Sequence, residues 1–270
     1  MTSAPCAVSA TRMSSEHRVL MQPAYVLHQR PYRDSSAIVE LFTPEHGRVG
    51  VVAKGVKRPK SPWRGLLQAF QPLLVSWSGR GELATLIGVD AQGETLRLPP
   101  AVIASGFYLN ELLMRLLHRH DAHVELFSCY DSTVRHLAAL TSGVESTQVG
   151  LEVALRRFEI RLLASLGYGL VLDHDVASGA PIEREKTYRY QIDRGPVADI
   201  ENGEGIVVHG STLLAMEAGS LDAEQDRREA KRLMRAALGR HLGDKPLFSR
   251  QLLSQGSGPV TQRNHDERES

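Results

Sequence analysis

Five short apolar runs, separated by turn-forming residues, occupy the stretch from Pro23 to Gly88 and limit the folds open to this chain. Sequences such as PYRDSS, TPEHG and SGRGE stand between them, and residues of these types end strands. The predicted strands are Ala24–Gln29, Ala37–Phe42, Arg48–Lys54, Pro72–Trp77 and Leu83–Ile87. Short strands with one long connection after the third predict a small five-stranded barrel of the OB type, with an SH3-like barrel as the competing interpretation.

Beyond Leu98–Pro100 the apolar spacing changes to three and four residues, which is typical of amphipathic helices. The residues with this spacing are Phe107, Leu109, Leu112, Leu113, Leu116 and Leu117, then Phe127, Tyr130, Val134 and Leu137, then Leu151, Leu155, Phe158, Leu162 and Leu166. Gly167–Gly169 end the third helix. Residues 173–210 are expected to be irregular, with a short hairpin near Thr187–Ile192, before helices over 222–241 and 246–253.

These patterns predict an α+β multidomain chain, in which an N-terminal five-stranded OB-fold β-barrel precedes a mainly α-helical domain with a small irregular insertion. The predicted boundaries are 1–20 for a disordered N-terminal extension, 21–98 for the barrel, 99–253 for the helical domain with its insertion near 173–210, and 254–270 for a disordered tail. Met13 and Met21 are alternative starts of the chain.

Cysteine usage and hydropathy predict a cytoplasmic protein. The two cysteines, Cys6 and Cys129, provide neither a disulfide framework nor a four-thiolate zinc site. No run of 18 apolar residues is present to span a membrane. The first 20 residues lack the apolar core of a signal peptide.

The segment between His46 and Gly81 is basic and contains no acidic residue, although the net charge of the whole chain is only +1. Its cations are Arg48, Lys54, Lys57, Arg58, Lys60, Arg64 and Arg80. Pro59 and Pro62 are expected to keep the loop extended and out of a helix. Such a loop beside a barrel can follow a phosphate backbone, and Trp63 can stack on a base. Trp77 alternates with Leu73 and Val75, so we expect it in the core.

Other interpretations of the basic loop remain open from the residues alone. It can be a solvated loop that keeps the barrel soluble, or the binding surface of a protein-interaction adaptor that meets an acidic partner. An enzyme, such as a nuclease, is a third class. The sequence contains no GxxxxGK[ST] loop, no GxGxxG after a strand and no GxSxG elbow. We therefore predict no enzymatic activity, no catalytic residue and no cofactor.

Two polar clusters in the region expected to be helical or irregular do not predict a metal site. His118 and His120, in the sequence HRHDAH, point about 200° apart on a continuous helix and cannot share an ion unless the helix ends there. Asp173-His174-Asp175 lacks a nearby third partner. Arginines on the helices, including Arg156, Arg157 and Arg161, are either ordinary solvent-facing groups or the rim of an apolar groove for an acidic peptide or a terminal carboxylate.

Several blocks of the sequence resemble the RecO family of recombination mediators. The most specific is YVLHQRPYRDSSAIVELFTPEHGRVGVVAKGVKRPKSPWRGLLQAFQPLLVSWSGRGEL, residues Tyr25–Leu83. The others are FYLNELLMRLL (Phe107–Leu117), ELFSCYDSTVRHLA (Glu125–Ala138), LRRFEIRLLASLGYG (Leu155–Gly169) and GDKPLFSRQLL (Gly243–Leu253). Together they extend the resemblance over about residues 22–253.

The resemblance implies a protein of DNA repair, homologous recombination and the DNA damage response. It implies binding of single- and double-stranded DNA, annealing of complementary strands, and loading of RecA with RecR on DNA coated by single-strand-binding protein. A cytoplasmic, bacterial location with association to the nucleoid during repair follows from that role. The residues expected to bind DNA are Arg48, Lys54, Lys57, Arg58, Lys60, Trp63, Arg64 and Arg80, and those expected to hold the acidic tail of single-strand-binding protein are Arg115, Arg119 and Arg135.

One departure from the family separates this chain from many of its members. They carry a four-cysteine zinc module after the helix that ends here at Gly167–Gly169, but residues 173 to about 199 contain no cysteine. The chain is therefore similar to the zinc-free subgroup, and the insertion is expected to be held by contacts other than a metal.

Overall fold

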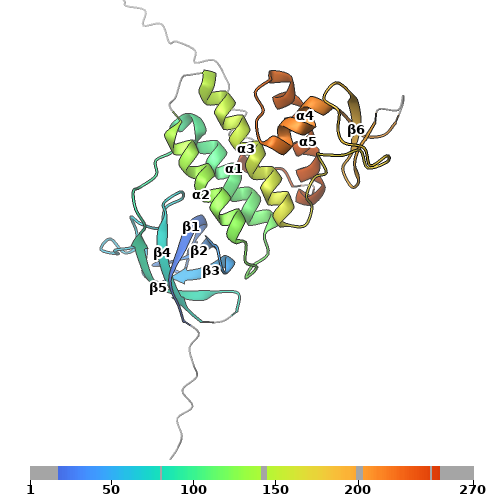
Figure 1. Cartoon of the computed structure of the whole chain (residues 1–270). Helices are drawn as coiled ribbons and strands as arrows, with labels where there is room; N and C mark the ends of the chain where they lie inside the picture. Colours follow the sequence, from blue (N-terminus) through green and yellow to red (C-terminus); the bar gives the residue numbers. More distant parts are fainter. Residues whose placement is uncertain (1–17, 80, 141–144, 199–202, 244, 250–270) are drawn as a thin grey trace, which may run out of the picture.

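The computed structural model describes residues 18–79, 81–140, 145–198, 203–243 and 245–249. The first half contains β1 (Arg18–Tyr32), β2 (Ser36–Thr43), β3 (Gly47–Ala53), β4 (Leu73–Ser78) and β5 (Ala84–Ala91). The second contains α1 (Pro100–Leu116), α2 (Val124–Ala139), α3 (Glu145–Ser165), β6 (Thr187–Gln191), β7 (Gly195–Ala198), β8 (Ile206–His209), α4 (Gly210–Ala218) and α5 (Glu224–Leu242). In Figure 1 the barrel lies on one side of α1–α3, and α4, α5 and β6 lie on the other.

The five strands close into a barrel in the order β1-β2-β3-β5-β4, which confirms the predicted five-stranded OB-type fold. All neighbouring strands are antiparallel except β3 and β5, which run parallel where the barrel closes. Alternate side chains fill its interior, because successive residues of a strand point to opposite faces. Val39, Val51, Val75 and Trp77 are among these core residues, so the expected core position of Trp77 is confirmed.

The first strand begins earlier than the sequence indicates. Residues 18–20, which the sequence assigns to a disordered extension, belong to β1, because Arg18 pairs with Ser78 and Val19 with Trp77 of β4. A bulge between Val19 and Gln22 interrupts the alternation of apolar residues here. This interruption concealed the first part of the strand. Residues 1–17 of the predicted extension lie outside the described residues.

The helices pack around a second core that continues into the barrel wall. Tyr25 and Phe42, from β1 and β2, are almost completely buried in the same cluster as the apolar residues of α1, α2 and α3. Asn110 of α1 donates to the backbone oxygens of Val26 and Leu27 at 3.4 and 3.1 Å. The helical part thus rests directly on the outer surface of β1 and β2.

The insertion after α3 is more regular than predicted. The expected hairpin near Thr187–Ile192 is present as β6 and β7, and β8 adds a third strand in the order β7-β6-β8. The helix α4 follows β8 directly and was not predicted, because its nine residues are too short for a clear periodicity. Of the predicted last helix (246–253), Phe248 and Ser249 are helical, while residues 250–253 and the predicted tail (254–270) lie outside the described residues.

Candidate nucleic-acid interface

The long connection between β3 and β4 is a series of tight turns and not the extended loop that its prolines led us to expect. The amide of Ser61 donates to Arg58 O at 3.0 Å, and the amide of Arg64 donates to Ser61 O at 3.4 Å. Pro59 and Pro62 each follow the first residue of one of these turns. That position suits proline because its fixed φ matches the turn. The prolines therefore bend the loop while still keeping it out of a helix.

The cations of this loop face solvent. Five of them are exposed and have no ion pair within the part of the chain that the structure describes: Lys54, Lys57, Arg58, Lys60 and Arg64. We call these five residues the basic loop cluster. Apolar residues of the same loop hold it on the barrel, since Val56 and Leu67 are buried in the barrel core. Trp63 is half-buried and packs against that core, so only part of its ring is accessible.

Arg48, assigned to the DNA-binding set from sequence, lies instead where the barrel meets the helices. Its Nε is 3.7 Å from Glu40 Oε2, and its guanidinium donates to the backbone oxygen of Met114 in α1. Burial lowers the pKa of Arg48, while the neighbouring Glu40 opposes this effect. Its contacts inside the molecule remove Arg48 from the exposed surface of the loop. Arg80 lies outside the described residues.

Arg119, expected from sequence to hold a protein partner, contacts the same buried carboxylate. Its guanidinium donates to Glu40 Oε1 and, at 2.9 Å, to the backbone oxygen of Glu82. Two arginines from distant parts of the chain thus neutralise one glutamate at the junction. The backbone also joins the barrel to the connection after α1.

The amide of His120 donates to Arg48 O at 3.1 Å. At Gly47 the two chain segments are so close that a Cβ would lie 1.7 Å from Asp121 O, so no side chain fits there.

The other two arginines assigned to a partner differ in their availability. Arg115 donates to the backbone oxygens of Leu242 and Pro246, where α5 ends. It therefore satisfies carbonyl groups that a helix end leaves without partners. Arg135 pairs with Asp131 at 2.8 Å and keeps half of its side chain exposed. Only Arg135 of the three retains substantial exposure to a partner.

The histidines of HRHDAH occupy the connection between α1 and α2, so the helix ends before them. His123 contacts Asp121 at 3.4 Å and Ser165 Oγ at 2.8 Å. Its role here is to fix the connection on α3. Across the described residues, no group of three or more His, Cys, Asp or Glu side chains is arranged to hold a metal ion.

The cysteine-free insertion is organised around Asp175, which is buried. Its Oδ1 accepts hydrogen bonds from the amides of Ala177 and Ser178 at 2.7 and 3.0 Å. Its Oδ2 accepts one from the amide of Ala198, the last residue of β7, at 2.8 Å. Tyr188 adds a contact by accepting the amide of Glu183 at 2.9 Å. One carboxylate therefore joins the two ends of the cysteine-free insertion.

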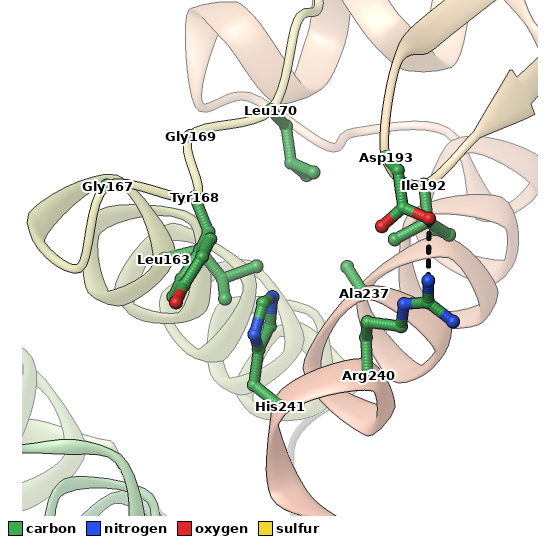
Figure 2. A pocket seen from close by; sticks show the side chains of 10 residues that line it. All are labelled: Leu163, Gly167, Tyr168, Gly169, Leu170, Ile192, Asp193, Ala237, Arg240 and His241. Carbon is green, nitrogen blue, oxygen red and sulfur yellow. Dashed lines mark hydrogen bonds and ion pairs between the residues drawn. The ribbon is translucent and has the colours of Figure 1, made fainter.

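A cavity of about 460 Å³ opens between the ends of α3 and α5 and the β6–β7 turn. Figure 2 shows the rings of Tyr168 and His241 together on one side, and the Arg240–Asp193 ion pair on another. The two rings stack with centroids 4.0 Å apart, and the ion pair measures 2.9 Å. The apolar part of the lining comes from Leu163, Leu170, Ile192 and Ala237. The cavity thus combines apolar side chains with a guanidinium at its rim, and none of its lining residues belongs to the arginines for which the sequence left an apolar groove open.

Sequence reasoning also missed cations outside the basic segment. Arg30 and Arg33 are exposed at the turn between β1 and β2, next to the loop, because the amide of Lys57 donates to Ser35 O at 2.9 Å. These cations are visible in the sequence QRPYRDSS, but it precedes the segment between His46 and Gly81 that contains no acidic residue.

None of the helices in the described parts of the chain is both long and apolar enough to cross a membrane.

Comparison with known proteins covers nearly the whole chain. A family model described as "Recombination protein O N terminal" matches residues 17–92, and one described as "Recombination protein O C terminal" matches residues 100–251. The protein named "DNA repair protein RecO" of Nitrosospira multiformis is 50% identical over 237 residues, which cover 87% of this chain and 94% of that protein. The protein of the same name from Methylococcus capsulatus is 48% identical over 248 residues, covering 92% and 98% respectively. The chain therefore belongs to the RecO family of DNA repair and recombination proteins.

Proposed function

We propose that this protein binds single- and double-stranded DNA through the phosphate backbone, and that the basic loop cluster is the main contact. The observation that supports the proposal is that Lys54, Lys57, Arg58, Lys60 and Arg64 are all exposed and carry no ion pair among the described residues. Cations that are already paired within a protein release fewer counterions when they approach DNA. The engaged residue Arg48 is therefore left out of the proposed set.

Annealing follows from the same surface. Two strands repel each other through their phosphates, and a cationic surface that holds both reduces this repulsion. No step of this kind breaks or forms a covalent bond, so the proposed role is that of a mediator and not of an enzyme. In a cell this mediator would act in the cytoplasm, at the nucleoid, together with RecR, to help load RecA on DNA coated by single-strand-binding protein.

The test is a salt titration of DNA binding by fluorescence anisotropy. Replacing the five residues of the basic loop cluster with glutamine should weaken binding to every sequence alike and reduce the slope of log K against log salt by about 3.5 on single strands, at about 0.7 per contact. A charge-matched control replaces five exposed cations of α5: Arg228, Lys231, Arg232, Arg235 and Arg240. Equal effects of the two variants, or an unchanged slope in the first, would contradict the proposal. Binding of an acidic protein but not of DNA would favour the adaptor.

We further propose that the cavity between α3 and α5 holds the acidic C-terminal tail of single-strand-binding protein. Its apolar lining suits an apolar side chain, and Arg240 suits a carboxylate. Arg240 is now paired with Asp193, but both side chains are about two-thirds exposed, at 64% and 65%. An ion pair this exposed contributes little, so a ligand carboxylate can replace Asp193 at small cost.

A labelled tail peptide distinguishes this position from the arginines chosen on sequence. Arg240→Glu should lower peptide affinity about tenfold or more, because it reverses a charge beside a bound carboxylate. Arg232→Glu, on the same helix and outside the cavity, is the control. Arg135→Glu tests the exposed alternative on α2. Loss of peptide binding in Arg135→Glu and not in Arg240→Glu would move the site to α2.

A further inference from the structure

The end of β1 and the turn that follows it carry three side chains that lie outside the basic segment: Arg30, Tyr32 and Arg33. Arg30 pairs with Ile38 across the two strands, and Tyr32 pairs with Ser36. Ala37 and Val39, on either side of Ile38, belong to the barrel core. Because side chains alternate along a strand, Ile38 and its partner Arg30 lie on the outer side of the barrel wall, and Tyr32, two residues on, shares that side. Ile38 is itself covered, at 3% exposed, whereas Tyr32 is half-buried and Arg30 is exposed. The helices cover much of the outer surface of β2, but the loop between strands 1 and 2, which is another place where OB barrels hold oligonucleotides, stays open at Arg30, Arg33 and Asp34.

This turn is continuous with the basic loop cluster. The amide of Lys57 donates to Ser35 O at 2.9 Å, so the loop packs directly against the turn. Lys54 follows Ala53, a core residue, and therefore faces outward like Tyr32. Their strands are separated only by β2, which puts the two residues about 10 Å apart at the usual strand spacing. Asp34 is the single acid between Gln29 and Ser36, and it is exposed at the tip.

Tyr32 has its ring covered by a neighbouring cation. The Cζ atom of Arg33 lies 5.2 Å from the centroid of the Tyr32 ring. An exposed contact of this kind corresponds to about two- to fivefold in an equilibrium. Stacking of a nucleobase on an aromatic ring corresponds to about fivefold to a hundredfold in affinity. A base is therefore able to displace the guanidinium, which is then free to bind a phosphate beside it.

We propose that the β1–β2 turn is a stacking site for an unpaired base of single-stranded DNA. The ring of Tyr32 receives the base, Arg33 and Lys57 contact neighbouring phosphates, and Arg30 extends the cationic track along β1. In a duplex each base is covered on both faces by its neighbours and is unavailable for stacking, so the ligand class is single-stranded nucleic acid. The inference rests on the proposed DNA binding and adds a selectivity for single strands to it.

Tyr32→Ala tests the stacking contact in the full-length protein. Its affinity for a single-stranded oligonucleotide should fall about five- to a hundredfold, while duplex affinity stays within about twofold. Tyr32→Phe keeps the ring and should bind like the unaltered protein. Phe107→Ala is the matched control, because Phe107 of α1 is a partly exposed aromatic residue whose ring packs on a neighbouring side chain, Phe70, away from the turn. Melting followed by circular dichroism establishes that each variant is folded.

An abasic single strand supplies a second measurement that needs no variant. The unaltered protein should bind it as weakly as Tyr32→Ala binds the normal strand. Equal binding of abasic and normal strands, or equal losses on single strands and duplex in Tyr32→Ala, would overturn the stacking site. If the variant of the basic loop cluster loses all DNA binding while Tyr32→Ala binds single strands like the unaltered protein, the stacking site is wrong but the proposed DNA binding stands. If that loop variant still binds both forms of DNA, the proposed function itself fails.

Discussion

Asp175 is the residue on which the shape of the insertion depends most, so replacing it with alanine tests how a segment without cysteines is held. Its side chain is 5% exposed. The substitution removes the acceptor of three amides, those of Ala177, Ser178 and Ala198. Hydrogen bonds to a charged group contribute about 1.5–3 kcal/mol each. Because the three donor residues are themselves exposed, water replaces part of the hydrogen bonding that their amides lose. We therefore expect a total loss of about 2–4 kcal/mol in the free energy of unfolding.

The loss should depend on pH. Burial by itself raises the pKa of Asp175, but the amides of Ser178, Ala198 and Ala177 outweigh it and hold that pKa below its ordinary value. A carboxyl group with a lowered pKa in the folded state stabilises the protein above its unfolded pKa of about 3.9 and loses that contribution as pH falls through the folded pKa. The difference between the unaltered protein and Asp175→Ala should therefore be full at pH 7 and smaller below about pH 4.

Urea denaturation at both pH values measures the loss, and hydrogen exchange of peptides from the insertion locates it. Asp173→Ala is the matched control, because Asp173 is exposed and its side chain pairs with the neighbouring His174 at 2.8 Å. We expect the control to leave both readouts unchanged. The reasoning is refuted if Asp175→Ala unfolds like the control, or if exchange of residues 173–198 does not increase.

Three further substitutions test contacts that join the barrel to the helices. Gly47→Ala, with φ at +57 and Asp121 O only 1.7 Å from the added Cβ, should lower thermal stability by more than about 2 kcal/mol. The control Gly93→Ala, with φ at +75 and open space around it, should cost only about 1–2 kcal/mol, and equal losses would contradict the steric argument. Arg119→Met leaves Glu40 with Arg48 alone, so urea denaturation should show a loss of about 2–4 kcal/mol in the free energy of unfolding. The double variant Arg119→Met/Glu40→Gln should recover part of that loss; no recovery would show that an uncompensated buried charge is not its cause. Asn110→Leu removes the hydrogen-bond donor to Val26 O and Leu27 O and the acceptor of the Tyr130 hydroxyl. The same assay should show a loss of about 2–4 kcal/mol in the free energy of unfolding, and a loss below about 0.5 kcal/mol would show that these hydrogen bonds contribute nothing.

The regular elements of this protein were largely predictable because their signals are local. The strands around Ile38 and Val75 alternate core and outward residues, and the helices around Leu113 and Phe158 repeat every three or four residues. The errors occurred where the local pattern is interrupted. A bulge after Val19 concealed the start of β1, and the nine residues of α4 were too few to show a period.

The candidate site was predictable only in part. Exposure of the basic loop cluster follows from its composition, since lysine and arginine without acidic partners remain in water. The turn-forming role of Pro59 and Pro62 was missed, because proline is compatible with both an extended chain and the second position of a turn. The cavity at Tyr168 and Arg240 gave no sequence signal, because its lining comes from three elements that meet only in the folded chain.

The sequence by itself determined the barrel, the helices, the family and the position of the exposed cationic loop, since each depends on residues close together along the chain. The tertiary structure decided which arginines remain available to a ligand. Arg119 reaches Glu40 across 79 positions, and Arg115 reaches Leu242 across 127. The physical reason is that a guanidinium is removed from solvent by whatever acceptor the fold brings next to it. The sequence pattern around an arginine does not show which acceptor, distant along the chain, will lie close to it in space.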